Sequence, residues 1–361
     1  MLIYIVYFIF FMVLAVEYEL KPFKNILPLV ICIALLTFMA GFRGPEVSKD
    51  YEGYQYAFDT IHDMAGQLDI FVPILEPGFT AIVMAFRTLF VSNYGLAIML
   101  FFALTSVTLK TISFRELSFN PYLVLLFYYS HFFFLHEMTQ IRIGFASAIF
   151  FIALIYYLRD NKKLFILLIL CATFFHYSAL IYLVVLFVDP RTLNRYVYGI
   201  LLALSIILGY IKLPLLNFMG NVDPSDVSQR LSNYTYLVES GNAQSVNVFN
   251  VLNLLNIACC LFFLFVAPAQ RLREDKPLTL FLKCNIFSIF LLSLLSGVPS
   301  LAFRFSELFG IVSMFVFASL VRYLPFKKLN ILITVITAMI IFYAIAFHLD
   351  LLNPYYIINI R

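Results

Sequence analysis

Long apolar runs recur along the whole chain and constrain its fold. Their length is close to the ~20 residues that a helix needs to cross a bilayer. Of the 361 residues, 63% are hydrophobic and only 12% are charged, whereas soluble domains carry about 25% charged residues. The strict apolar–polar alternation of membrane β-barrel strands is absent. Because lipid-exposed backbone must satisfy its own hydrogen bonds, the sequence predicts an all-α polytopic membrane protein with one membrane-embedded domain over residues 1–361.

The apolar runs also predict the individual helices. Full-length spans are expected at residues 1–16, 26–42, 94–113, 121–135, 142–158, 196–211, 247–266, 278–297, 303–321 and 329–347. Segment 78–92 is short and carries Arg87, and segment 164–188 is broken by FFHYS, so both are predicted to be re-entrant or interfacial. The total is about 10–12 transmembrane helices. Residues 2–16 lack a positive n-region and are expected to be a retained span, not a signal peptide.

Short basic loops predict the orientation in the membrane, because Lys and Arg accumulate on the cytoplasmic side. These loops are KPFK (21–24), KTISFR (110–115), RDNKK (159–163), RTLNR (191–195), QRLREDK (270–276) and PFKK (325–328). Segments 43–77 and 212–246 then form the two larger outer loops, the second of which is long enough to act as a lid. The alternative is that 78–92 and 164–188 both cross the membrane, which would place the basic residues of 159–163 outside.

Under this orientation, polar and ionisable residues from five separate segments gather on the outer side. They are Arg43, Asp50, Tyr51, Tyr54, Glu76, His136, Gln140, Arg142, His176, Arg304 and Glu307. Ionisable groups inside a bilayer cost on the order of 2.5–3.5 kcal/mol each on insertion scales, so they mark a candidate site. Structural alternatives stay open: Arg43 as a snorkelling anchor, His176 as a core histidine, and Arg304 with Glu307 as an i,i+3 pair.

Three sequence boxes carry a family resemblance. FRGPEVSKDYEGY (42–54), MTQIRIGFASAIFFIAL (138–154) and FFHYSALIYL (174–183) resemble, in order, three boxes of the EpsG-type polysaccharide polymerases, which are Wzy-like bacterial enzymes. EPGF (76–79) and NPYY (353–356) are also similar to that family. The chain departs from the family pattern in two places: Ser48-Lys49 replaces the usual glycine before the Asp, and Ile143 replaces the Gln after the Arg.

The resemblance implies a polymerase of lipid-linked repeat units in surface polysaccharide synthesis, of the O-antigen or exopolysaccharide type. The expected partners are donor and acceptor oligosaccharides on a polyprenyl (undecaprenyl) diphosphate in the outer leaflet, with a chain-length regulator protein as a further candidate. The implied location is a bacterial inner (cytoplasmic) membrane, with the active site facing the periplasm or the outside. Neither a nucleic-acid partner nor a cofactor is implied.

The resemblance and the chemistry of the residues together suggest roles. Guanidinium groups suit the charge that develops on a diphosphate leaving group, so Arg142 is the first candidate, with Arg43 and Arg304 as partners. The acceptor hydroxyl needs a base, for which His176, Asp50 and Glu76 are the candidates. His176 is favoured because the unperturbed pKa of a histidine side chain lies nearest neutrality. Gln140, Tyr51, Tyr54 and Glu307 are expected to bind substrate. No metal-ligand pattern is visible, so we expect activity to survive a chelator.

Three other functions are compatible with the same residues. A flippase or transporter for the lipid-linked glycan would line a path through both leaflets with charge, whereas here the charges gather on one side. A ligase that moves finished glycan to another acceptor would use the same diphosphate chemistry. A membrane acyltransferase would need an entry site for an acyl carrier, for which the sequence gives no firm signal.

Overall fold

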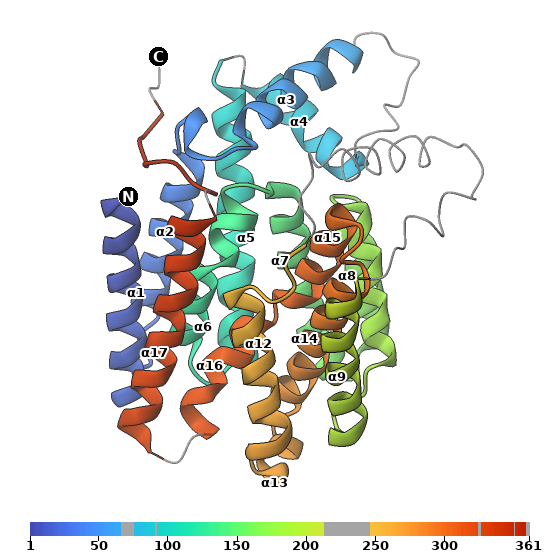
Figure 1. Cartoon of the computed structure of the whole chain (residues 1–361). Coiled ribbons are helices and arrows are strands. Elements are labelled where there is room, and N and C mark those ends of the chain that lie inside the picture. The colour runs from blue at the N-terminus through green and yellow to red at the C-terminus, as the bar shows by residue number, and fades with distance from the viewer. Residues whose placement is uncertain (66–75, 91, 213–245, 324–325, 350, 359–361) are drawn as a thin grey trace, which may run out of the picture. The chain divides into compact units, whose positions relative to one another are not determined.

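The computed structural model describes residues 1–65, 76–90, 92–212, 246–323, 326–349 and 351–358. In these ranges every regular element is helical, and the β contacts are two isolated antiparallel bridges (Figure 1). The predicted all-α fold is therefore confirmed. The chain divides into two compact units, Met1–Leu186 with Phe317–Arg361, and Phe187–Val316. The prediction of a single membrane-embedded domain stays a prediction.

The first unit contains most of the helices. They are α1 (Leu2–Leu20), α2 (Leu27–Gly41), η1 (Pro45–Val47), α3 (Tyr51–Ala65), α4 (Pro77–Leu89), α5 (Tyr94–Leu117), α6 (Pro121–Ser130), η2 (Phe133–Glu137), α7 (Ile141–Leu158), α8 (Lys162–Thr173), most of η3 (Tyr177–Phe187), the end of α16 (Ser313–Tyr323), α17 (Lys327–Tyr343) and η5 (Ala344–His348).

The second unit holds α9 (Arg195–Ile211), α12 (Val251–Leu261), η4 (Phe262–Val266), α13 (Ala269–Glu274), α14 (Lys276–Leu294) and α15 (Pro299–Gly310). Helix α14 lies at its centre and packs against α9, α12 and α15. Polar contacts join these helices inside the apolar surroundings: Asn285 donates to Asn256 at 3.1 Å, and the Ser288 hydroxyl donates to the Ser306 carbonyl at 2.6 Å.

Most predicted spans coincide with observed helices to within a few residues. Five described helices are long and apolar enough to cross a membrane, namely α1, α5, α7, α14 and α17 with η5, and a sixth is added if α15 and α16 form one broken span. Six further apolar helices are shorter, including α2, α6 and α9. The protein is therefore a multi-pass membrane protein, as its composition predicts.

Local sequence explains where several of these helices begin. Asn120 accepts hydrogen bonds from the backbone N–H groups of Tyr122 and Leu123, both at 3.1 Å, and Pro121 follows it at the first helical position of α6. Asn161 caps α8 in the same way through Leu164. These side chains satisfy N–H groups that have no partner within the helix, and proline loses nothing at a position where no donor is needed.

Segment 164–188 is broken where the sequence predicts. Helix α8 ends at Thr173, η3 begins at Tyr177, and His176 lies between them. Tyr182 of η3 stacks on Phe150 of α7, with ring centroids 3.7 Å apart. Since His176 lies at the level of the start of α7, as described below, the chain reverses direction at His176 and runs back along α7. The reversal returns the segment toward the end of α7 that leads into the 159–163 loop, as the re-entrant interpretation requires.

Candidate active site

Glu76 lies between Arg142 and His176 and contacts both. Its Oε2 atom accepts a hydrogen bond from Arg142 Nη1 at 2.5 Å, and its Oε1 atom lies 3.2 Å from His176 Nδ1. The Glu76 side chain is 6% exposed and that of His176 12%, whereas Arg142 is 29% exposed. Three of the predicted site residues, which are distant in sequence, therefore form one cluster, with the guanidinium as its accessible member. We call these three residues the Glu76 cluster.

A close backbone contact brings Glu76 to His176. The N–H of Gly78, in the first turn of α4, donates to the carbonyl of Phe174 at 2.8 Å. A Cβ atom on residue 78 would lie 2.9 Å from that carbonyl oxygen and 3.1 Å from the Phe175 ring. Only glycine leaves room for this approach. The EPGF segment (76–79) and the FFH segment (174–176) are thus held together by this close backbone contact as well as by the contact between Glu76 and His176.

The start of α7 carries Arg142. Backbone hydrogen bonds fix Gln140, which precedes this helix. The N–H of Gln140 donates to the Leu135 carbonyl at 2.8 Å, and the Gln140 carbonyl accepts from the Gly144 N–H at 2.9 Å. The Arg142 guanidinium also lies over the ring of Phe79, 5.5 Å from its centroid. A cation over an aromatic face is attracted to it, so Phe79 helps to orient Arg142.

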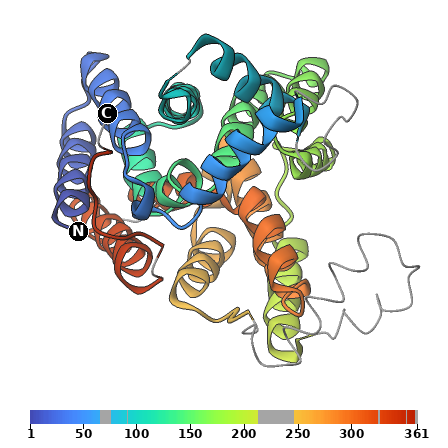
Figure 2. The same ribbon diagram turned by 90° about the horizontal axis from the view of Figure 1, so that it is seen from above.

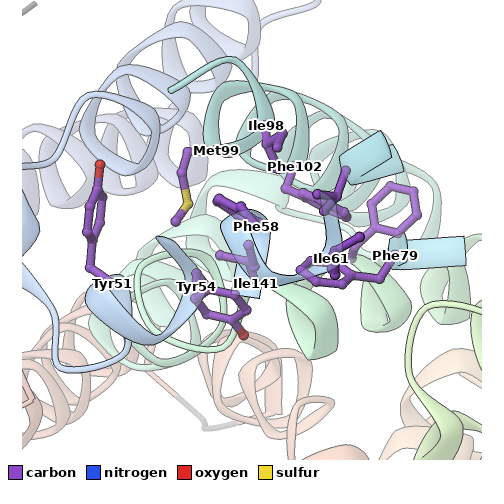
Figure 3. Close-up of a cluster of buried hydrophobic side chains, with 11 residues drawn as sticks. Tyr51, Tyr54, Phe58, Ile61, Phe79, Ile98, Met99, Phe102 and Ile141 are labelled. Atoms are coloured by element: carbon purple, nitrogen blue, oxygen red, sulfur yellow. The ribbon is translucent and has the colours of Figure 1, made fainter. Parts of the chain in front are cut away.

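An apolar cluster supports this arrangement. Its buried members come from α3, α4, α5 and α7, and Figure 3 shows Tyr51 at one edge and Phe79 at the other. They are Tyr51, Tyr54, Phe58, Ile61, Phe79, Val83, Ile98, Met99, Phe102, Ile141 and Phe145. Tyr54 also makes a side-chain hydrogen bond with Arg142. The two tyrosines expected to bind substrate are therefore mostly buried, and Tyr54 belongs to the surroundings of Arg142.

The Glu76 carboxyl group stays ionised despite its burial. Burial by itself raises the pKa of a carboxyl group, but the hydrogen bond to His176 and the charge of Arg142 act more strongly in the other direction and hold the pKa of Glu76 below its ordinary value. Because an ionised carboxylate can only accept, His176 donates its Nδ1–H to Glu76. That tautomer leaves Nε2 as an acceptor, and Nε2 is buried without a hydrogen-bond partner among the described residues.

Arg43 is close to the same cluster of aromatic residues but is enclosed. It is 1% exposed, donates to the Ala40 carbonyl and to Ser48 Oγ at 3.3 Å, and lies over the ring of Tyr51. Within the described residues no carboxylate makes an ion pair with it. Burial lowers the pKa of Arg43 to about 10, with the nearby Tyr51 acting in the opposite direction, so the group remains charged at neutral pH.

Asp50 lies near both arginines but on the surface. Partial burial raises the pKa of Asp50, and the charges of Arg142 and then Arg43 oppose that shift. Its carboxyl group makes no ion pair in the part of the chain that the structure describes. Among the three candidate bases, Glu76 and His176 therefore contact each other, whereas Asp50 stands apart.

Two further polar atoms near the start of α7 are buried without a partner among the residues described. They are Gln140 Oε1 and His136 Nε2. The other ring nitrogen of His136 lies 3.4 Å from the Ser147 hydroxyl. A buried acceptor or donor without a partner is costly. The expected role of Gln140 in substrate binding stays a prediction.

Arg304 and Glu307 belong to the second unit, where both lie on α15. Arg304 is exposed and Glu307 is partly buried. Their predicted roles stay predictions. Most of the second outer loop, 213–245 of the predicted 212–246, lies outside the described residues.

The sequence interpretation missed a second charged cluster. Lys110 of α5 and Glu137 form an ion pair, and Tyr128 donates to the same carboxylate oxygen of Glu137 at 2.8 Å. The side chains of Lys110 and Glu137 are 0% and 2% exposed. The assignment of Lys110 to a cytoplasmic basic loop was therefore wrong, because the residue lies inside α5 with its amine buried. A lysine that lies within the length of an apolar span could have indicated an internal partner.

Two of the basic loops lie at the ends of α2 and α7 that are remote from the candidate site residues. Arg142 is in the first turn of α7, and the 159–163 loop follows the last residue of that helix, Leu158, which lies about 24 Å from Arg142 along the helix at 1.5 Å per residue. The same relation holds for α2, where the 21–24 loop precedes the helix and Arg43 follows it. The basic residues of these loops and the arginines of the candidate site therefore lie at opposite ends of α2 and α7.

Comparison with known proteins agrees with the sequence boxes. The model of the EpsG family matches residues 26–357, a range that contains all three boxes and the whole Glu76 cluster. No curated protein and no solved structure matches the chain. The match covers far more than half of the sequence, and the chain belongs to the EpsG family.

Proposed function

We propose that this protein polymerises lipid-linked oligosaccharide repeat units. Membership of the EpsG family indicates a polysaccharide polymerase in general. The finer proposal is glycosyl transfer from a polyprenyl-diphosphate-linked donor to a sugar hydroxyl of an acceptor unit. The Glu76 cluster is the observation that supports it best, because it offers an accessible cation beside a histidine with a free acceptor nitrogen.

Arg142 is the proposed ligand of the diphosphate. Its side chain is partly exposed, and its guanidinium contacts Glu76, Tyr54 and Phe79 in the absence of substrate. A fixed cation stabilises the charge that develops on the leaving group without having to reorganise during the reaction. Arg43 and Arg304 are further proposed cations for the lipid-linked substrates, and Tyr51 is a proposed substrate contact together with Tyr54.

His176 is the proposed base, with Glu76 as the group that orients it. The contact between Glu76 and Nδ1 favours the tautomer in which Nε2 accepts a proton. In the reaction, the acceptor hydroxyl oxygen forms a bond to the anomeric carbon of the donor, and the bond from that carbon to the diphosphate oxygen breaks. The hydroxyl proton passes to His176 Nε2, and polyprenyl diphosphate leaves. Asp50 is the alternative base.

The position of the basic loops supports an outward-facing site. Lys and Arg residues in short loops remain on the cytoplasmic side, and in the first unit these loops lie at the end of α2 and α7 opposite the Glu76 cluster. The cluster would then meet the outer leaflet, where the lipid-linked substrates are expected. A bacterial inner membrane and a metal-independent reaction are parts of the same proposal.

Replacement of Arg142 by Ala tests the proposal. Removing one preorganised group that stabilises developing charge typically costs about 10²–10³ in rate, so we expect Arg142→Ala to stop elongation and to leave single repeat units on the lipid. The measurement is the length distribution of the glycan in a strain that lacks the native gene. Arg87→Ala is the matched control, because Arg87 pairs with exposed Asp59 and lies in the last turn of α4, away from Glu76 at its start.

Long polymer from Arg142→Ala at normal protein levels would refute the role of Arg142. The same deletion strain separates the competing functions. Loss of a flippase would strand the glycan in the cytoplasmic leaflet, loss of a ligase would leave long chains unattached, and loss of a polymerase would leave single units on the outer leaflet.

A further inference from the structure

The C-terminal segment 351–358 pairs with segment 42–48, which carries Arg43. The two segments run antiparallel beside the end of α2 (Figures 1 and 2). They are joined by backbone hydrogen bonds from Gly44 to Tyr356 (3.0 Å), from Ile358 to Phe42 (3.0 Å) and from Asn353 to Val47 (3.1 Å), and by the bridges Arg43–Ile357 and Ser48–Leu352. The C-terminal segment therefore meets the α2–α3 loop at Arg43.

Gly44 and Tyr356 fit each other tightly at the centre of this pairing. A Cβ atom on residue 44 would overlap the Tyr356 ring. The backbone of Gly44 has φ −69° and ψ 160°, which any residue can adopt. Glycine is therefore required here for space under the ring and not for an unusual backbone conformation. The Tyr356 hydroxyl also accepts a hydrogen bond from the Glu46 N–H at 3.2 Å.

The pairing encloses Arg43. Ser48, which accepts a hydrogen bond from Arg43 Nε, is itself bridged to Leu352, and Arg43 is bridged to Ile357. Arg43 as a whole is 1% exposed. A charge buried without a carboxylate partner is costly, so the position of Arg43 depends on contacts that keep its loop closed around it.

The same loop sets the start of α3. Val47 is fully buried, and the N–H of Tyr51 donates to the carbonyl of Ser48 at 3.3 Å. One turn further along α3, Tyr54 makes a hydrogen bond with Arg142. A shift of the 42–48 segment would therefore move both a proposed cation and a neighbour of the Glu76 cluster.

We infer that Gly44 and Tyr356 form a joint that positions Arg43 and the start of α3 for the reaction. The joint acts through other residues, so both are positioning residues. The geometry of the joint comes from the pairing of 42–48 with 351–358. Its expected effect on elongation rests on the proposed polymerase function.

The test uses three variants in the full-length protein. Gly44→Ala places a methyl group under the Tyr356 ring, and we expect elongation of purified lipid-linked repeat units to slow by roughly 10- to 100-fold, as small misplacements of catalytic groups do. Tyr356→Ala removes the ring but keeps the backbone pairing, so we expect a loss of only a few-fold. The double variant Gly44→Ala/Tyr356→Ala should recover to the level of Tyr356→Ala, because the methyl group then has space.

Gly53→Ala is the matched control, since no atom lies within 4 Å of a Cβ atom at that position. It should elongate glycan at the wild-type rate. The inference would be contradicted by a Gly44→Ala variant that elongates glycan at the wild-type rate, or by a double variant that elongates no faster than Gly44→Ala.

Amide hydrogen exchange gives a readout that does not depend on activity. The N–H groups of Gly44, Asn353 and Ile358 donate across the pairing, so they should exchange slowly in the wild type, faster in Gly44→Ala, and slowly again in the double variant. Unchanged exchange in Gly44→Ala would also overturn the inference. A wild-type protein that never elongates glycan would instead refute the proposed function, whatever the exchange pattern.

Discussion

Two carboxylates in the first unit each hold a cation and a third polar side chain, but their surroundings differ. Glu76 contacts Arg142 and His176, and Arg142 is 29% exposed. Glu137 contacts Lys110 and Tyr128, and the whole of this second group is buried. We call Glu137, Lys110 and Tyr128 the Glu137 cluster. The same kinds of residue thus occur once at an accessible position and once in the interior.

The difference in exposure suggests different roles: the Glu76 cluster in the proposed reaction, and the Glu137 cluster in the stability of the fold. The proposed diphosphate contact falls on Arg142, whose side chain is 29% exposed. The side chains of Lys110 and Glu137 are buried, so we expect the Glu137 cluster to stabilise the fold by joining α5 to the segment that precedes α7. Breaking a buried ion pair is strongly destabilising, whereas replacing both partners by apolar residues is often neutral. The two clusters should therefore respond in opposite ways to the same substitutions.

The largest expected effect comes from removing one carboxylate charge at a time. Glu137→Gln leaves the buried amine of Lys110 without a counter-charge, and we expect a loss of about 3–5 kcal/mol of stability, seen as a lower melting temperature in detergent and less folded protein in the membrane. Glu76→Gln should keep the melting temperature within a few degrees of wild type, because Arg142 reaches solvent, while elongation of glycan falls by about 100-fold.

These two variants are controls for each other, since both replace a buried carboxylate by its amide. The comparison fails if Glu76→Gln unfolds the protein as readily as Glu137→Gln does, or if Glu137→Gln is fully stable but inactive.

Replacing both partners should separate the clusters further. Lys110→Met with Glu137→Leu removes the pair without leaving a buried charge, and we expect stability equal to wild type or greater by about 1–4 kcal/mol, with polymer still made. Arg142→Met with Glu76→Leu should also give folded protein, but one that makes no polymer. Melting temperature and glycan length in the same strains measure both effects, and polymer from the second double variant would argue against an active site at Arg142.

The smallest expected effect concerns pH. The pKa of Glu76 lies below its ordinary value of 4.5 in the folded protein, so the folded state favours the ionised form. The stability that this provides is fully present above about pH 5 and is lost as the pH falls through the folded pKa. The melting temperature of wild type minus that of Glu76→Gln should therefore be constant from pH 5 to 8 and shrink below pH 5. A difference that grows on acidification would contradict the ionised state of Glu76.

Local pattern was sufficient for the helices and for the break at His176. Span length, apolar run and interruption are properties of consecutive residues, and α1, α5 and α7 lie where the runs predict. The choice of Arg142, His176 and Glu76 as site residues also came from sequence, because ionisable groups near the ends of apolar runs are rare. Their roles in catalysis stay predictions.

The partners of those residues came only from the tertiary structure. The sequence favoured His176 as the base only through the ordinary pKa of histidine and left Glu76 and Asp50 as alternatives, and the fold brings Glu76 and His176 together while Asp50 remains on the surface. It also pairs Lys110 with Glu137, and the C-terminal segment with the Arg43 loop. The physical reason is that such contacts depend on how each helix is rotated and how closely two backbones approach, as at Gly44 and Gly78. Hydrophobic length determines that a segment is a helix in a membrane, and the packing of side chains decides which charges meet.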